Sequence, residues 1–374
     1  MWWMTFLIGF FVLLLAVFFF PIISQLFVRG RNATDEVLEQ VHSLDVLIPC
    51  HNEEGRLRET LKSVVTAIRN ANRLFPDLNV NLSVGLDACS DNTVLDTHGF
   101  RLKAMAFSHK SKWKVLRSLV SASTADWIAL VDAGTVWDPR LLRNCHPLFE
   151  RAENMCVAPS YLALKAGRLA RAYWRLEAFL KCLENKSGGP VSVHGATVFY
   201  RRKDLLKALT LLEGREWIND DVVIPMALRI VSPGKRIVYA QNQEGGFSVH
   251  DTSPRLGPAE VFARKRIARG NLQWIGHLVP VMWEWSPLVL LISLRRAVRL
   301  FWCVIPLCLI LSANIAAWEY TILTRNPLLP MMTLIVSVVL VIALTRLPAF
   351  AASWLAIGSF LGRGRNEEDE VRWS

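Results

Sequence analysis

The sequence predicts an α/β fold in which a doubly wound sheet lies between membrane-spanning segments at both ends of the chain. Two observations carry this prediction. From Asp45 to Asp132, short apolar runs alternate with stretches of helical periodicity, which is typical of a mainly parallel sheet covered by helices. Long uncharged apolar stretches occur near the two ends of the chain, whereas the middle has the mixed composition of a water-soluble domain.

The individual elements follow from periodicity. Strands are predicted where apolar runs are short or alternate with polar residues, at 44–49, 79–86, 101–107, 127–131, 157–164 and 235–240. Helices are predicted where apolar residues recur at helical spacing, at 56–69, 115–123, 168–186, 202–212, 222–230 and 260–273. Two further apolar runs flank Gly195, where a missing side chain would let a ligand approach the backbone. The adjacent His194 is interpreted as structural.

Three uncharged stretches, at 2–28, 300–318 and 327–345, are each long enough for a helix to cross a hydrocarbon core of roughly 30 Å. The first lacks a basic start and is too long for a signal peptide, which favours an anchor. Arginines flank the stretches on the sides that place the central domain and the C-terminus in the cytoplasm. The shorter run 347–361 is expected in the membrane interface.

This reading divides the chain into five segments. They are an N-terminal transmembrane helix at 1–28, a cytoplasmic α/β domain at 40–280, an interfacial amphipathic element at 281–299, a transmembrane and interfacial region at 300–361 and a charged cytoplasmic tail at 362–374. The predicted location is therefore the cytoplasmic membrane, with several passes and the central domain inside the cell.

Charge and cysteine content narrow the classes of partner. The net charge of +11 fits anionic lipid head groups and a phosphorylated substrate. No aromatic-basic module supports a nucleic-acid partner. The seven cysteines form no CxxC pair, which fits a reducing compartment and argues against a disulfide frame or a zinc site.

The buried run 127–131 ends on Asp132, and the rest of the chain is organised around this acid. An acid at the carboxyl end of a central parallel strand lies where open α/β sheets bind ligands. Its oxygens suit a divalent cation, Mg²⁺ or Mn²⁺, which in turn can hold a diphosphate. The alternative from the residues alone is an acid that caps the next turn.

Polar loops after the other strands add candidates of the same kind. Asn52 and Glu53 follow the first strand and Asp87 follows the second, where each could bond a base or ribose or else cap a turn. Lys112 belongs to a basic cluster that opens a helix. Because lysines there oppose the helix dipole, an anion nearby would account for them, with a solvated charge run as the alternative.

Asp220 and Asp221 form a second acidic pair, directly before an apolar helical segment. Two adjacent carboxylates that face a cleft raise the pKa of one of them, which suits a general base near neutral pH. The alternative is a helix-capping pair. Further on, the helix at 260–273 is dense in basic residues, and Arg266 and Arg269 share a face that could bind diphosphate or lipid head groups.

Taken in order, these motifs resemble membrane-anchored family 2 glycosyltransferases of the GT-A fold, related to polysaccharide, chitin and poly-N-acetylglucosamine synthases. Val46-Leu-Ile-Pro-Cys-His-Asn-Glu53 is similar to the P-x-x-N-E loop, Leu86-Asp-Ala-Cys-Ser-Asp-Asn-Thr93 to the D-N-C-S-D-x-T loop and Asn219-Asp-Asp-Val-Val-Ile-Pro225 to the N-D-D-x-x-x-P form of the E-D motif. Asp132 resembles the first acid of the D-x-D metal motif.

The resemblance implies a role for each candidate. It implies nucleotide-sugar binding by Pro49, Asn52, Glu53, Asp87, Lys112, Asp132, Arg266 and Arg269, a metal ion on Asp132, and a general base at Asp221 with Asp220 beside it. The reaction implied is the transfer of a sugar, with inversion, to a hydroxyl of a glycan or lipid-linked acceptor for the cell envelope. The donor that the family resemblance implies is a UDP-sugar. Membrane lipids and an export or polymerisation protein are the further partners it implies.

Two departures from the family pattern bear on this reading. Gly134 stands where most relatives carry the second acid of D-x-D, although Asp132-Ala-Gly-Thr135 resembles the chitin-synthase version. The Q-x-x-R-W motif of processive synthases is incomplete, because no Trp follows Arg269. Two alternatives therefore stay open at this stage, a synthase that uses a polyprenyl phosphate acceptor and a catalytically degenerate membrane scaffold.

Overall fold

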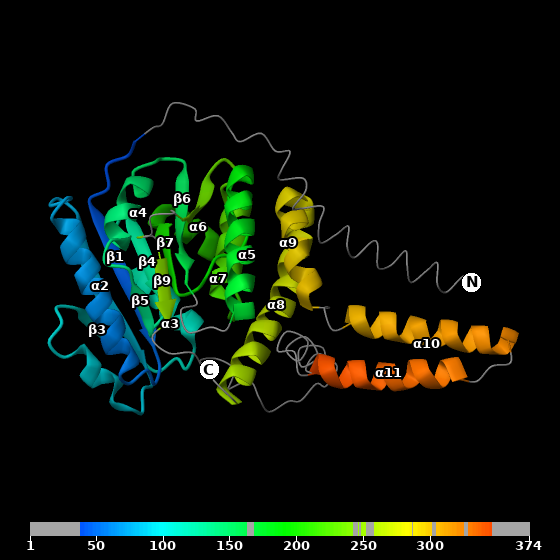
Figure 1. Ribbon diagram of the computed structural model, residues 1–374. Coiled ribbons are helices and arrows are strands. Elements are labelled where there is room, and N and C mark those ends of the chain that lie inside the picture. The colour runs from blue at the N-terminus through cyan, green and yellow to red at the C-terminus, as the bar shows by residue number, and fades with distance from the viewer. Residues whose placement is uncertain are drawn as a thin grey trace.

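The computed structural model (Figure 1) describes residues 38–345, apart from 163–167, 242–245, 247, 252–257, 286, 301–303 and 325–327. The predicted first span at 1–28, the interfacial run at 347–361 and the tail at 362–374 lie outside the described residues.

The first half of the sheet is parallel, as the alternation of strands and helices predicts. β1 (Ser43–Cys50) lies between β2 (Asn79–Asp87) and β4 (Trp127–Val131), and β3 (Lys103–Phe107) extends the sheet beyond β2. The carboxyl ends of all four strands therefore meet at one edge of the sheet, together with the loops that follow them.

The second half of the sheet is mixed. β7 (Thr197–Arg201) pairs antiparallel with β4, β6 (Asn154–Tyr161) pairs antiparallel with β7, and β8 (Arg236–Ala240) runs parallel to β6. β9 (Ser248–Asp251) and β5 (Thr135–Trp137) complete the sheet beyond β6. Neither was predicted, since strands this short show no periodicity, and the strand predicted at 157–164 in fact begins and ends earlier.

Helices cover both faces of the sheet. α2 (Arg56–Asn72) and α4 (Leu141–Phe149) pack on one face, and α3 (Lys112–Ala122), α6 (Arg202–Leu211) and α7 (Asp220–Val231) pack on the other. The alternation within β1 explains the two cores, because Val46 and Ile48 belong to the core under α2 while Leu47 belongs to the core under α3. Near the sheet lie α5 (Arg168–Glu184) and two short 3-10 turns, η1 (Asn92–Thr97) and η2 (Asn185–Ser187).

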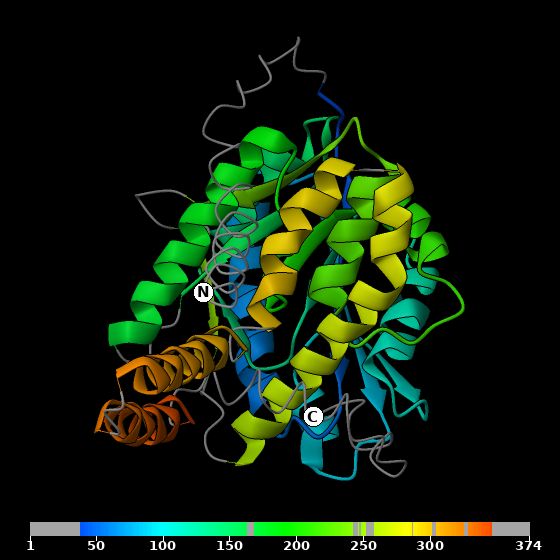
Figure 2. The ribbon, with the colours of Figure 1, turned by 90° about the vertical axis from the view of Figure 1, so that its right-hand side faces the viewer.

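Two long helices lie across α7 (Figure 2). α8 (Pro258–Trp285) continues well beyond the predicted end at 273, and α9 (Pro287–Leu300) packs back against it. Trp274, Leu278 and Met282 of α8 are buried in the core that α7 shares, so the predicted boundary at 280 falls inside a helix of the domain.

An apolar helical hairpin projects from the body of the protein (Figures 1 and 2). α10 (Val304–Thr324) and α11 (Leu328–Thr345) lie side by side, joined by a hydrogen bond of 2.7 Å from Asn314 Nδ2 to Ser337 Oγ. By length and composition, the part of the chain that the structure describes contains one candidate membrane span, 306–324, and a shorter apolar helix at 328–342. Three spans are therefore not shown.

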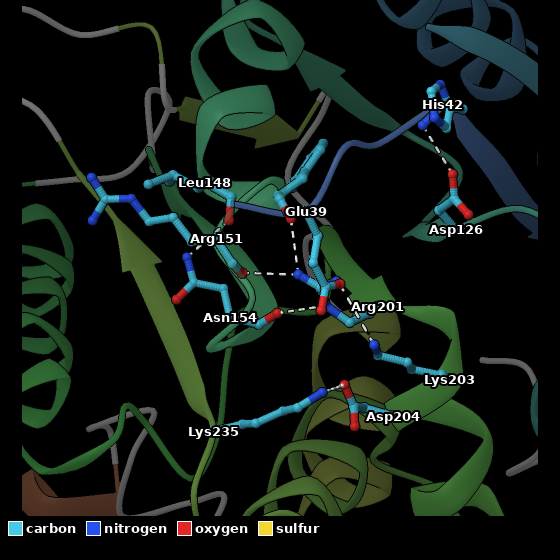
Figure 3. A network of polar contacts seen from close by, with 11 residues as sticks. Glu39, His42, Asp126, Leu148, Arg151, Asn154, Arg201, Lys203, Asp204 and Lys235 are labelled. Atoms are coloured by element: carbon cyan, nitrogen blue, oxygen red, sulfur yellow. Dashed lines mark hydrogen bonds and ion pairs between the residues drawn. The ribbon is translucent and has the colours of Figure 1, made fainter. Parts of the chain in front are cut away.

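A polar network fastens the chain where it enters the domain (Figure 3). Arg201, buried at the end of β7, donates to the carbonyl oxygens of Phe149, Arg151 and Asn154 and pairs with Glu39. The register of β7 places Arg201 opposite Trp127, at the amino end of β4 and therefore away from Asp132. The network therefore lies at the edge of the sheet opposite to the one where the carboxyl ends of β1 to β4 meet.

Candidate functional site

A cluster of carboxylates forms where β4, α3 and α7 meet. Lys112 Nζ lies 2.7 Å from Asp132 Oδ1 and 3.1 Å from Asp220 Oδ1, so one ammonium group joins the acid after β4 to the acid that begins α7. Asp221 follows directly, and its backbone oxygen accepts from Val193 N at 3.0 Å. We call Asp132, Asp220, Asp221 and Lys112 the acid centre. Candidates widely separated in sequence thus share one place.

The position of Lys112 depends on the loop after β2. Ser111 caps α3, and the carboxylate of the buried Asp87 accepts from Ser111 N at 2.8 Å. Burial alone would lower the pKa of Lys112, but the carboxylates of Asp132 and Asp220 outweigh burial and hold that pKa above its ordinary value. Lys112 is therefore a permanent cation that brings the two carboxylates together.

Asp221 is a carboxyl of this centre with a raised pKa. Burial raises the pKa of its carboxyl and the charge of Arg296 opposes that rise, while Asp220 adds to it. A raised pKa is the property that suits a carboxylate for taking a proton near neutral pH. The structure thus combines the predicted general base with an environment that favours this role.

Gly195 opens the space between the two acid positions. A Cβ at Gly195 would lie 3.3 Å from Asp221 Cβ and 3.6 Å from Asp132 Oδ2, so the backbone here borders both acids. His194 stacks on Tyr161 with ring centroids 3.7 Å apart, and its Nδ1 accepts from Ala196 N. Burial and Lys181 lower the pKa of His194 to about 3, so this ring is neutral.

The predicted nucleotide loops lie side by side at the same edge. Asn52, with a positive φ of 53°, accepts from Ser90 N at 2.8 Å, and Glu53 N donates to Thr93 Oγ1 at 2.7 Å. These bonds tie the loop after β1 to the loop after β2. Pro49 is buried inside β1 and Asp87 is buried as well, so the structure shows both as supports of the loops. Direct contact of either residue with a nucleotide stays a prediction.

The basic face of α8 lies beside the acid centre. Arg266 is near enough to Lys112 for its charge to lower the pKa of that lysine. Gly270 brings α8 against Asn219, because a Cβ there would lie 2.4 Å from Asn219 Cγ. Asn219 Nδ2 donates to Ile267 O at 2.9 Å, which fastens the start of α7 to α8. Arg269 is half-buried on the same helix, one turn from Arg266.

Sequence reasoning missed two arginines of this region. Arg296 is one of the arginines expected to flank the stretch 300–318, yet its guanidinium donates to Ser192 Oγ at 3.0 Å and to Asn271 Oδ1 at 3.3 Å, beside Asp221. Arg56 was counted only as the start of a helix. No local signal marks either residue, because each reaches the site from an element whose packing the sequence does not specify.

The residues present fit a cation that is shared with a substrate. In the described stretches, no group of three or more His, Cys, Asp or Glu side chains is arranged to hold a metal ion. Asp132 and Asp220 nevertheless face a common cation, Lys112, and the side chain of Asp132 is 42% exposed. One or two carboxylates, completed by water and substrate phosphates, form a donor set that Mg²⁺ accepts.

Comparison with solved structures supports the fold. The chain is similar to the mannosyltransferase PcManGT from Pyrobaculum calidifontis in complex with GDP-Man and Mn²⁺, at 15% identity and a TM-score of 0.61, over 94% of this chain and 97% of that one. It also matches glucosyl-3-phosphoglycerate synthase from Mycobacterium tuberculosis at 16% identity and a TM-score of 0.40, over 61% of this chain and 76% of that one.

Comparison with protein families gives the assignment. No curated protein matches the chain. The model of the family described as glycosyltransferase-like family 2 matches residues 42–270, which are more than half of the 374 residues and contain the whole acid centre. The chain therefore belongs to glycosyltransferase-like family 2, and it is a glycosyltransferase.

Proposed function

We propose that this enzyme transfers a sugar from a nucleotide-sugar, with inversion, to a hydroxyl group of a glycan or glycolipid acceptor at the cytoplasmic face of a membrane. The observation that carries the proposal is the acid centre, in which Lys112 joins Asp132 and Asp220 while the half-buried Asp221 lies next to them. Such a centre offers one carboxylate to bind a cation that holds the diphosphate, and another carboxylate to accept a proton.

The chemistry assigned to the chain is a single displacement. Asp221 takes the proton of the acceptor hydroxyl while that oxygen attacks the anomeric carbon, and the bond from this carbon to the diphosphate oxygen breaks. Asp220 and Lys112 hold the arrangement of charges around Asp221. Gly195 leaves room beside Asp132 and Asp221 for the reacting groups to approach.

The donor diphosphate is assigned to the side of Asp132. This residue would hold Mg²⁺ or Mn²⁺ together with the diphosphate, and the bound ion would neutralise charge on the leaving group. Lys112 and Arg266 supply further positive charge next to it. The motif resemblance favours a UDP-sugar, whereas the complex of PcManGT holds GDP-Man and Mn²⁺, so both nucleotides belong in any binding test.

Membrane attachment is part of the proposal. It is supported by the α10–α11 hairpin, whose apolar side chains such as Leu323 and Ile335 are exposed, and by Trp283 and Trp285, each 74% exposed. Tryptophans at such positions are typical of a membrane interface. The full chain should stay with membranes after an alkaline carbonate wash, and release into the wash would contradict attachment.

The test of the general base is Asp221→Asn. Because the amide cannot accept the proton, transfer to a hydroxyl acceptor should fall by about 100-fold or more, while nucleotide binding persists. Asp77→Asn, in an exposed turn before β2, is the matched control and should keep full activity. Turnover and nucleotide affinity are measured on the same detergent-solubilised preparations.

Survival of activity in Asp221→Asn would point to the other acceptor class. A polyprenyl phosphate brings its own ionised oxygen and needs no general base, so such a synthase would tolerate the substitution. Radiolabel recovered in a lipid fraction that mild acid hydrolyses would then identify the acceptor as a phosphate. The assignment of Asp221 as base would be wrong in that case, while nucleotide-sugar transfer would stand.

A further inference from the structure

A side chain at Gly134 would collide with Arg56 as the two residues now lie. Gly134 lies in the turn after Asp132 with a φ of 88°, and its N–H donates to Thr60 Oγ1 at 2.8 Å. A Cβ at Gly134 would lie 2.4 Å from Nη2 and 2.8 Å from Cζ of Arg56. The direction that a second acid would take is therefore filled by a guanidinium group.

The guanidinium of Arg56 is held by Glu53 as well as packed against Gly134. Arg56 is the first residue of α2, directly after the loop that contains Asn52 and Glu53, and its Nη1 donates to Glu53 Oε2 at 2.6 Å. Its Nε is buried and has no hydrogen-bond partner among the described residues, and the side chain as a whole is 30% exposed. The guanidinium thus lies between the predicted nucleotide loop and the turn that carries Asp132.

We propose that Arg56 replaces the second acid of the metal motif and binds the donor diphosphate directly, next to a cation held by Asp132. This inference rests on the proposed function of the site. A guanidinium stays charged at any working pH and presents pairs of N–H groups that match two oxygens of a phosphate. Where a guanidinium takes the place of a carboxylate, the site loses a metal ligand and gains a positive charge. We therefore expect the affinity for the diphosphate to depend less on the metal ion.

The inference gives Gly134 a physical reason. The φ of 88° favours glycine at this position, and the absence of a side chain lets the guanidinium pack on the backbone. The inference also fits the scarcity of metal ligands, since the described residues hold no group of three or more that could bind an ion. The alternative is that Arg56 only packs on Gly134 and pairs with Glu53, without contact to any ligand.

The test measures binding of UDP and of GDP to the full chain in detergent, by calorimetry, across a Mn²⁺ titration that starts at zero. Arg56→Gln should weaken metal-free binding at least about tenfold and make the remaining binding depend more steeply on Mn²⁺. Arg56→Lys keeps the charge without the paired N–H groups and should fall between the two. Arg58→Gln, on an exposed neighbour in the same helix, should match the unchanged chain.

A double variant makes the reverse change. Arg56→Ser/Gly134→Asp restores the acid and clears its space, so nucleotide binding should become dependent on Mn²⁺. Equal affinity and equal Mn²⁺ dependence in Arg56→Gln and the unchanged chain would overturn this inference alone. Failure of the unchanged chain to bind either nucleotide at any Mn²⁺ concentration would overturn the donor site itself, and the two failures are therefore distinct.

Discussion

At the residue scale, four neighbouring charges set the chemistry of Asp221. The charges that act on it come from Arg296 on α9, Asp220 on α7, Lys112 on α3 and Asp132 after β4. The charges of Asp220 and Asp221 in turn act on the phenol of Tyr200 on β7. Burial raises the pKa of Asp221, and Arg296 is the strongest influence in the opposite direction. The arginine therefore keeps the base ionised at a lower pH than burial would allow.

Removal of Arg296 should move the pH dependence of transfer. Because a nearby positive charge favours the carboxylate, its loss raises the pKa of Asp221 further. The acidic limb of kcat/KM, which reports the base in the free enzyme, should shift to higher pH by about one unit in Arg296→Gln. Arg296→Lys should shift it less, and pH–rate profiles of the three proteins measure this.

The control for this prediction is Arg143→Gln. Arg143 lies exposed on α4, where its guanidinium contacts the neighbouring Asn144. This substitution removes the same charge without touching the acid centre, so its profile should coincide with that of the unchanged chain. An unshifted limb in Arg296→Gln would show that Arg296 serves packing and does not tune Asp221.

At the scale of elements, the sequence predicts what depends on local pattern. Asp132 and Lys112 could each be placed at one edge of the sheet, because parallel strands bring their carboxyl ends to that edge and each residue follows such an end. The contacts of Arg56 with Gly134 and of Arg296 with Ser192 could not be predicted, because each joins two elements whose relative packing leaves no periodic trace. The three residues of β5 are too few for a period, and β9 is hardly longer.

The contact between α8 and α7 offers a prediction at the same scale. Gly270→Ala places a Cβ 2.4 Å from Asn219 Cγ, so either α8 or the Asn219 side chain must shift at the start of α7, which carries Asp220 and Asp221. We expect a loss of about 1–3 kcal/mol in stability, as for overpacking, together with reduced turnover. Denaturant midpoints and transfer rates measure the two effects.

Gly276→Ala supplies the matched control within α8. Apart from its own helix backbone, no described residue has a heavy atom within 4 Å of a Cβ at Gly276, and Gly276 is exposed. Alanine should stabilise the helix by up to about 1 kcal/mol and leave turnover unchanged. If both alanine variants behaved alike, close contact between α8 and Asn219 would not be what positions the acids.

At the scale of the whole molecule, the acid centre and the Arg201 network lie at opposite edges of the sheet. The acid centre lies at the carboxyl end of β4, and the Arg201 network lies at the amino end of the same strand, where the chain enters the domain. Arg201 also lies over Trp127, with Cζ 5.1 Å from the ring centroid. A change in this network should therefore act on folding while the site keeps its geometry.

Arg201→Met tests this separation. The substitution removes the Arg201 donor from the carbonyl oxygens of Phe149, Arg151 and Asn154, and each buried acceptor left unsatisfied typically costs about 1–3 kcal/mol. Lys203→Met removes a 57% exposed partner of Glu39 and should cost at most about 1 kcal/mol. Below the unfolding transition both proteins should bind nucleotide with unchanged affinity. A loss of affinity in Arg201→Met that parallels its loss of stability would show that the two edges of the sheet are coupled.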